Sequence, residues 1–269
     1  MTGAICSACP ATRSPDANNL MVWTLIGRGL VVGVVAGLLA GVFAFVFGEP
    51  RVQDAIDIEQ ARNAHASLSF VPVTAHIGDW VVSRGEQRGG LFLATALYGI
   101  AAGGLFAIAF AALRGRGSTR SDWQLATRLA GAVFVAIVLV PFIKYPANPP
   151  AVGDPDTIAA RTAYYLIMLV GSALAMFAAA RVMWSVRPDA PPWQRPLAGA
   201  GTFVAVAGGL ALALPAVDEV PKDFPATLLW EFRLSSLGTQ AVLWAAIGIG
   251  YGIAMQRTAV ATGARTAAV

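Results

Sequence analysis

The sequence predicts an all-α protein: a polytopic membrane helix bundle with six transmembrane helices, arranged as three hairpins with both termini cytoplasmic. Composition and charge pattern together predict it. Hydrophobic residues make up 57% of the 269 residues and charged residues only 13%, whereas soluble domains carry roughly 25% charged residues. So few charged side chains cannot cover a water-soluble globule, and a disordered chain would need low hydrophobicity. Long uncharged segments also separate the charges, which is typical of an integral membrane protein.

Six uncharged segments have lengths close to those that a bilayer requires: 20, 25, 15, 19, 22 and 23 residues in chain order. A helix needs about 20 apolar residues to cross a hydrocarbon core roughly 30 Å thick. The segments lie between Arg28 and Glu49, Arg88 and Arg114, Arg128 and Lys144, Arg161 and Arg181, Arg195 and Asp218, and Arg233 and Arg257. The third is short, so we begin its helix near Leu125 and expect Arg128 or Lys144 to snorkel or to face protein.

The distribution of Lys and Arg predicts the orientation. With the N-terminus inside, the inner segments carry 11 basic and 3 acidic residues, a net charge of +8. The outer segments carry 8 basic and 12 acidic residues, a net charge of −4. Both termini are therefore predicted to be cytoplasmic. The total net charge of +4 is small and divided between the two sides, which disfavours a nucleic-acid partner.

We expect three regions: a flexible cytoplasmic tail over residues 1–20, a transmembrane domain over 21–257, and a second flexible cytoplasmic tail over 258–269. The first tail contains one C-x-x-C pair, Cys6 and Cys9. In a reducing compartment this is an inert reduced pair, with an accessory metal or redox role as the alternative. A zinc site usually needs two such pairs.

Four glycines at a spacing of four residues run along the first span: Gly29, Gly33, Gly37 and Gly41. This spacing gives one helix face a smooth groove, in which another backbone can approach closely. We expect this face to pack within the chain, with a subunit interface as the alternative.

The three hairpins each have an outer loop that contains prolines. These loops are predicted to begin at Gly48, Lys144 and Leu214. Parallel repeats of this kind are common in transporters, whose substrate path lies between the repeats. Ordinary up-and-down topology gives the same pattern.

The outer side carries the residues that can bind a cation. Glu49, Asp54 and Asp57 follow the first span, and the only two histidines, His65 and His76, lie in the same segment. Carboxylates are hard oxygen ligands for divalent ions, and imidazole suits Co²⁺, Ni²⁺ or Zn²⁺. A solvated acidic helix with exposed histidines is the alternative interpretation.

The second outer loop begins at Lys144 and reads KYPANPPAVGDPDT, with four prolines that prevent a regular helix and free backbone carbonyls. Non-helical backbone at membrane depth must be buried in protein or line water. Asn148 and the free carbonyls are candidate cation ligands, with a structural helix cap as the alternative. Lys144 needs a carboxylate partner. The candidates are Asp154, Asp156, Asp218 and Glu231.

The start of the last span carries Glu231 and Arg233, which are two residues apart and do not face each other on a helix. They are expected to pair across hairpins, for instance Glu231 with Arg161. Gln240 lies about two turns further inside the span. As a polar residue at depth, it is a candidate pathway residue.

Four segments resemble one known family, the CbtA-type predicted cobalt transporter subunits. They are GEP from Gly48, VSRGEQ from Val82, YPANPPAVGDPDTIAAR from Tyr145 and LPAVDEVPKDFPATLLWEFRLSSLGTQAVLW from Leu214. The resemblance implies a small polytopic subunit of a cobalt uptake system linked to cobalamin supply. It also implies a tiny single-span partner with a histidine cluster, a CbtB-type subunit. The family is usually described with five spans, so five is the alternative to the six that we count.

The leading hypothesis is a divalent metal permease subunit in the bacterial inner membrane, with cobalt as the substrate rather than a cofactor. Metal ligands are predicted among Glu49, Asp54, Asp57, His65, His76, Asn148 and Glu231, and pathway or structural residues among Lys144, Arg161, Arg233 and Gln240. Neither of the two lysines follows a phosphate-binding loop, so no ATP binding is expected. The sequence also lacks the HExxH motif of a metalloprotease, and we do not expect an enzyme. The alternatives are a non-transporting membrane scaffold and an anion or small-solute carrier that uses the outer arginines.

Overall fold

The computed structural model describes residues 15–67, 84–115 and 121–267, and within these ranges every regular element is a helix. Six helical segments there are long and apolar enough to cross a membrane, as the prediction of six spans requires. The segments are Val22–Arg62, Gly85–Leu113, Asp122–Lys144, Pro155–Ser185, Gln194–Ala213 and Ala226–Arg257.

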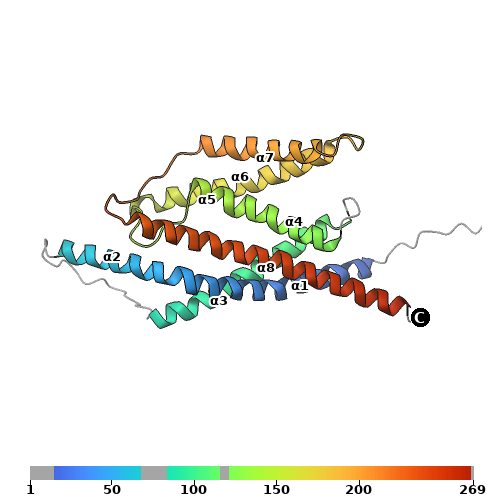
Figure 1. The fold of residues 1–269 in the computed structure, drawn as a ribbon, viewed down its shortest axis with the longest axis horizontal. Coiled ribbons are helices and arrows are strands. Elements are labelled where there is room, and N and C mark those ends of the chain that lie inside the picture. Colours follow the sequence, from blue (N-terminus) through green and yellow to red (C-terminus); the bar gives the residue numbers. More distant parts are fainter. Residues whose placement is uncertain (1–14, 68–83, 116–120, 268–269) are drawn as a thin grey trace, which may run out of the picture.

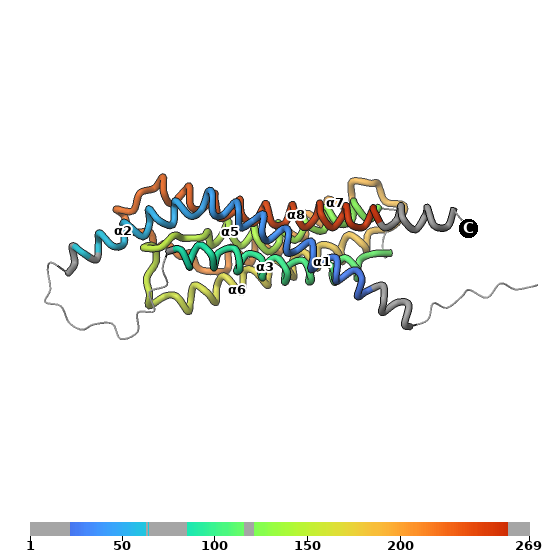
Figure 2. The backbone as a smooth tube through the Cα atoms, turned by 90° about the horizontal axis from the view of Figure 1, so that it is seen from below, coloured from blue at the N-terminus to red at the C-terminus, as the bar shows by residue number. Residues whose placement is uncertain are grey.

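The elements follow one another as α1 (Pro15–Phe43), η1 (Ala44–Gly48), α2 (Glu49–Ser67), α3 (Arg84–Leu113), α4 (Asp122–Phe134), η2 (Val135–Leu139), α5 (Val140–Lys144), η3 (Pro155–Thr157), α6 (Ile158–Ser185), α7 (Gln194–Ala213) and α8 (Ala226–Ala267). The long helices lie side by side along one axis (Figures 1 and 2). The start of α1 and the end of α8 lie at the same end of the bundle (Figure 1). We call the opposite end, which holds α2 and the loops 145–154 and 214–225, the outer end.

The glycine face of α1 packs against α3, as expected for packing within the chain. A Cβ atom on Gly29 would overlap the carbonyl oxygen of Gly103, and one on Gly33 would overlap that of Gly99. Further along the pair, Cβ atoms on Gly37 and Gly41 would meet Thr95. The two backbones therefore touch along several turns, because only glycine leaves room for this approach.

The main core lies between α1, α3, α4 and α8. At its centre Tyr251 of α8 is fully buried against Phe106 and Phe110 of α3, with ring centroids 5.4 and 4.9 Å apart. Its hydroxyl donates to the carbonyl of Leu25 in α1 at 3.2 Å. One tyrosine thus joins three helices, and a buried hydroxyl gains its partner from a backbone carbonyl.

The predicted three hairpins describe the order in which the spans are connected. They do not describe which spans pack against each other. Of the three predicted hairpins, only the first, α1 with α3, has its own two spans packed extensively against each other. In the third, α7 packs against α6 at the edge of the bundle, while α8 packs against α1 and α4 (Figure 1). The fold is therefore not a set of equivalent hairpin repeats.

The expected loop at Gly48 is wrong, because α1, η1 and α2 form one continuous helix. Pro50 lacks an N–H and its ring would clash with a carbonyl one turn earlier. The π-helical segment η1 accommodates this: the N–H of Glu49 bonds to the carbonyl of Ala44, five residues back. A π segment, η2, likewise ends two residues before Pro141, so a proline occurs in the third span without ending it.

The third span is longer than its uncharged segment indicated. It begins at Asp122 rather than near Leu125, because Ser121 caps the helix by accepting the N–H of Gln124 at 3.3 Å. Its 23 residues extend about 34 Å, enough to cross a hydrocarbon core. At the chain ends, α1 begins at Pro15 and α8 continues to Ala267, so helix extends past both predicted limits of the membrane domain.

Candidate functional site

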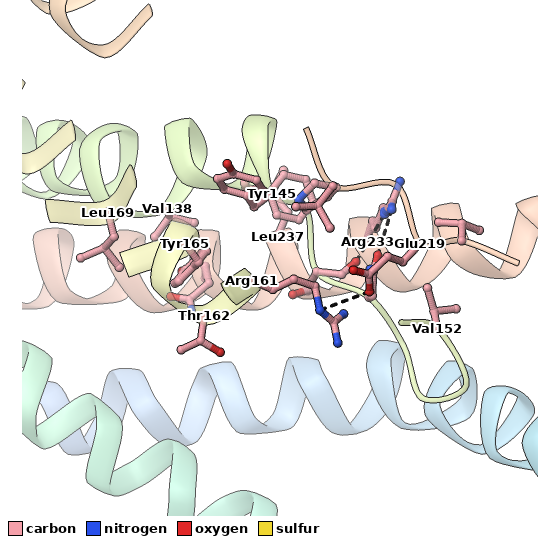
Figure 3. Close-up of a pocket in the computed structure, with 18 of the residues that line it drawn as sticks. Val138, Tyr145, Val152, Arg161, Thr162, Tyr165, Leu169, Glu219, Arg233 and Leu237 are labelled. Atoms are coloured by element: carbon pink, nitrogen blue, oxygen red, sulfur yellow. Dashed lines mark hydrogen bonds and ion pairs between the residues drawn. The ribbon is translucent and has the colours of Figure 1, made fainter. Parts of the chain in front are cut away.

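A cavity of about 560 Å³ lies at the outer end between α5, α6, α8 and the loops 145–154 and 214–225. Figure 3 shows Arg161, Glu219 and Arg233 gathered near the loops, with Val138 and Leu169 at the other end of the cavity. Its lining combines tyrosines, two arginines and two carboxylates with an apolar inner part. A volume of this size accommodates a small molecule or a hydrated ion.

Arg233 of α8 holds the 145–154 loop in place. Its guanidinium donates to the side-chain oxygen of Asn148 at 2.9 Å and to the carbonyl of Ala147 at 3.3 Å. The prolines leave these acceptors outside any helix, as the sequence indicated. Asn148 lines the cavity, but the oxygen that we predicted to bind a cation already accepts a bond from a cationic side chain.

Glu219 of the 214–225 loop ties that loop to α6 and is a residue that sequence reasoning missed. It accepts the Thr157 hydroxyl at 2.6 Å and the backbone N–H of Asp154 at 2.8 Å. A carboxylate oxygen also lies 3.2 Å from Nε of Arg161, close enough for an ion pair although the angle does not make a hydrogen bond. We call this arrangement the Glu219 latch.

The Glu219 latch favours the ionised carboxylate. The Thr157 hydroxyl and the Asp154 N–H, with a smaller contribution from the Arg161 guanidinium, hold the pKa of Glu219 below its ordinary value, although desolvation opposes them. The expected pairing of Arg161 with Glu231 is therefore wrong, because Arg161 pairs with Glu219 instead. The sequence held one signal of this: Glu219 lies in the proline-rich loop between α7 and α8, at the same predicted end of the molecule as Arg161.

A second bond joins the two loops at Tyr145. Its hydroxyl donates to the carbonyl of Pro215 at 2.7 Å. Burial and the nearby Tyr164 raise the pKa of Tyr145, so the phenol keeps its proton and remains a donor. The loops 145–154 and 214–225 therefore form a connected cover over the cavity.

The long helix of α2 is attached to the bundle by ion pairs. Glu231, a predicted metal ligand, pairs with Arg51 at 3.0 Å, and Glu49, another, pairs with Arg88 at 3.0 Å. Arg62 pairs with Asp223 of the 214–225 loop at 2.9 Å and lies over the ring of Phe224. These carboxylates therefore hold α2, α3 and α8 together at the outer end.

The remaining predicted ligands are spread over α2 or lie outside the described residues. Asp54 and Asp57 are exposed on α2, where Asp57 accepts the side-chain N–H of Gln53 at 2.8 Å. His65 belongs to α2, while His76 lies outside the described residues, as do Cys6 and Cys9. Across residues 15–67, 84–115 and 121–267, no three His, Cys, Asp or Glu side chains come together as a metal centre.

Lys144 finds a different partner from those we predicted. Its ammonium lies over the ring of Tyr145, 5.7 Å from the centroid. In the described part of the chain, no ion pair joins it to any of the four predicted carboxylates. A cation above an aromatic face is attracted by the quadrupole of the ring.

Gln240 lines the inner part of the cavity, seven residues along α8 from Arg233, or about 10 Å along the helix axis. Its side-chain oxygen is buried and, among the described residues, has no hydrogen-bond partner. A buried acceptor without a partner costs free energy. The oxygen would therefore gain from a donor within the cavity.

Of the comparisons with known proteins, one identifies a family. No curated protein and no solved structure matches the chain. The sequence of residues 22–256 matches the family described as "Probable cobalt transporter subunit (CbtA)", which is a family of transporter subunits rather than enzymes. The match covers all six spans and both outer loops, so the protein belongs to the CbtA family of probable cobalt transporter subunits.

Proposed function

We propose that this chain is the membrane subunit through which a bacterial uptake system, linked to cobalamin supply, carries cobalt across the inner membrane. The outer end faces the periplasm and both termini lie in the cytoplasm. The partner is a small single-span CbtB-type subunit with a histidine cluster. The membrane potential supplies about 2.3 kcal/mol per charge per 100 mV to an entering cation.

The observation that carries the proposal is Gln240. Its buried oxygen lacks a partner among the described residues and belongs to a cavity that adjoins the acidic outer end. Polar groups at membrane depth are costly and usually serve a pathway. An acceptor oxygen there interacts favourably with a cation or with the water bound to it.

The outer arginines favour a cation over the anion carrier that we considered as an alternative. The two that line the cavity are both engaged, Arg161 with the Glu219 carboxylate and Arg233 with Asn148 and Ala147. The lining carries two carboxylates, Asp218 and Glu219, which balance the two guanidinium groups. Among the described residues that line the cavity, positive and negative charges are thus equal in number, and both guanidinium groups already have partners.

Uptake of radiolabelled cobalt tests the proposal, measured with the gene present or deleted and with the partner gene present or absent. We expect the gene to raise uptake and Gln240→Leu to lower it roughly tenfold, the size of one lost hydrogen bond to a charged species. Thr239→Val is the matched control, because its hydroxyl bonds to the carbonyl of Ser235 within α8. Uptake that does not change on deletion would refute the proposal.

Orientation is tested separately with cysteines introduced one at a time into a chain without Cys6 and Cys9. Asp54→Cys and Asp156→Cys, both at exposed outer positions, should react with an impermeant maleimide added to intact cells. Asp189→Cys, exposed in the connection between α6 and α7, should react only after lysis. The reverse pattern would place the acidic end in the cytoplasm.

A further inference from the structure

The size of the cavity and the engagement of its oxygens lead to a narrower conclusion, which rests on the proposed function. We propose that the cavity takes the cobalt ion as its hydrated complex and recognises the coordinated water molecules, without replacing them by protein ligands. The substrate class at this site is thus a hexahydrated divalent cation.

The volume of the cavity is large enough for a hexahydrated ion. If each coordinated water occupies about 30 Å³, a hexahydrated ion fills about 180 Å³. The cavity, at about 560 Å³, accepts this complex with room to move. Direct ligands must instead converge to about 2 Å from one metal ion, whereas the polar groups here line a wide space and come from different segments.

The strongest oxygen ligands of the lining already have partners. Glu219 accepts bonds from Thr157 and Asp154 and pairs with Arg161, and the side-chain oxygen of Asn148 accepts from Arg233. A metal ion bound directly to either residue would compete with these donors for the same oxygens and would lie beside a guanidinium group. An ion that keeps its water shell requires neither this rearrangement nor the large cost of dehydration.

Two acceptors suit the coordinated waters, which are strong hydrogen-bond donors. Asp218 is exposed and lines the cavity beside Glu219, and Gln240 lies deeper with its oxygen unpartnered among the described residues. Because this oxygen is buried, accepting a bond from a coordinated water requires the amide to rotate. The hydrated ion would therefore meet a charged acceptor first and a neutral one further inside.

Hexaamminecobalt(III) tests the proposal, because its ammonia ligands do not exchange during a binding experiment and mimic the donor shell of a hydrated ion. The purified full chain, reconstituted in lipid, is titrated with Co²⁺ and then with the ammine complex. We expect the complex to displace Co²⁺, and bound Co²⁺ to keep the weak visible absorption of the octahedral aqua ion.

Variants separate recognition in the cavity from unspecific attraction of a trivalent cation. Gln240→Leu should weaken binding of the ammine complex about tenfold. Gln240→Glu keeps an acceptor oxygen and should retain binding, while the Thr239→Val control should bind as the unchanged chain does. Ammine binding that is equally strong in Gln240→Leu and the unchanged chain would contradict the assigned cavity.

The opposite result is equally clear. If Co²⁺ binds with intensified visible absorption and the ammine complex does not displace it, the protein ligates the metal directly and the inference is wrong. Cobalt uptake that still depends on the gene would then leave the proposed transport function standing. If neither ion binds the purified chain, the inference is also wrong.

Discussion

The α1–α3 interface and the cavity beside α8 represent two ways of joining helices in one bundle. In the first, glycines let the two backbones touch, and no side chain separates Gly33 from Gly99. In the second, α5, α6 and α8 stand apart around about 560 Å³ and are connected by loops, ion pairs and hydrogen bonds. Contact between backbones leaves no freedom to open, whereas side-chain bonds between loops can break one at a time.

This difference indicates which parts of the protein can move to admit a substrate. Packed interiors resist volume changes because their atoms are already in contact. The cavity is covered by the Glu219 latch and by the bond of Tyr145 to Pro215, which involve a few atoms each. We therefore expect α1 and α3 to act as a fixed frame, with opening confined to the loops 145–154 and 214–225.

The largest expected effect breaks the frame. Gly33→Leu places a side chain where the Gly99 carbonyl lies, and overpacking costs about 1–3 kcal/mol, more where rigid backbone is in the way. We expect little folded protein after extraction, measured as the monodisperse fraction in detergent and by thermal unfolding. Gly27→Leu is the control on the same helix, because a Cβ atom there meets nothing within 4 Å. Equal behaviour of the two variants would show that the contact is unimportant.

A smaller effect is expected where Arg233 holds the 145–154 loop. Arg233→Gln removes the hydrogen bonds from the charged guanidinium to Asn148 and Ala147. A hydrogen bond from a charged group contributes about 2 kcal/mol. The loop should be cut faster by protease while the bundle stays folded. Arg257→Gln, an exposed position on the same helix, should leave the cutting rate unchanged. A protected loop in Arg233→Gln would mean that the prolines alone fix its shape.

Ser172 gives a measure of one bond at the π segment of the third span. It is fully buried in α6, and its hydroxyl donates to the carbonyl of Ala136 in η2. Ser172→Ala should lower the free energy of unfolding by about 1 kcal/mol, the usual size of such a bond within a membrane. Ser185→Ala, whose exposed hydroxyl bonds only within its own helix, is the control. No difference between these variants in mixed-micelle unfolding would contradict the assignment.

The smallest expected effect is the pH at which the contacts of the Glu219 latch are lost. Because the pKa of Glu219 is lowered, chiefly by the Thr157 hydroxyl, the latch stabilises the closed loops above the pKa of a free carboxyl, about 4.3. This stability is lost as the pH falls through the lowered pKa. Thr157→Val should move the loss to higher pH, since the pKa of Glu219 then returns toward its ordinary value.

Spin labels at Asp156→Cys and Ala216→Cys, both exposed, report the separation of the two loops as the pH is lowered. Thr162→Val is the control, since that hydroxyl bonds to the carbonyl of Ile158 within α6. An opening pH that is the same in Thr157→Val and in the control would remove Glu219 from the latch.

The number and approximate positions of the spans were predictable because a bilayer imposes a length on every crossing helix. The glycine face of α1 was predictable for a similar reason, since the step from Gly29 to Gly33 aligns residues on one face of any helix. Local rules failed at Pro50, where a loop was expected. Whether a proline ends a helix depends on whether a wider turn can form before it, and here η1 provides that turn.

The partners of the charged residues could not be predicted. Glu231 pairs with Arg51, and Arg161 with Glu219, over separations of more than fifty residues. The charge pattern of the sequence predicted that these residues lie at the same end of the molecule, but it did not predict which of them pair. The same holds for Gln240, whose depth followed from its position in the span but whose place in the cavity did not.

The sequence by itself determined that this protein is a six-helix membrane bundle, because hydrophobicity and charge spacing act locally along the chain. It also determined that acidic groups gather opposite the termini. Only the tertiary structure decided that α7 lies beside α6 rather than α8, and that two proline-rich loops close over a cavity. The reason is physical: helix packing and ion pairs depend on surfaces from distant segments, and those surfaces exist only once the helices have assembled.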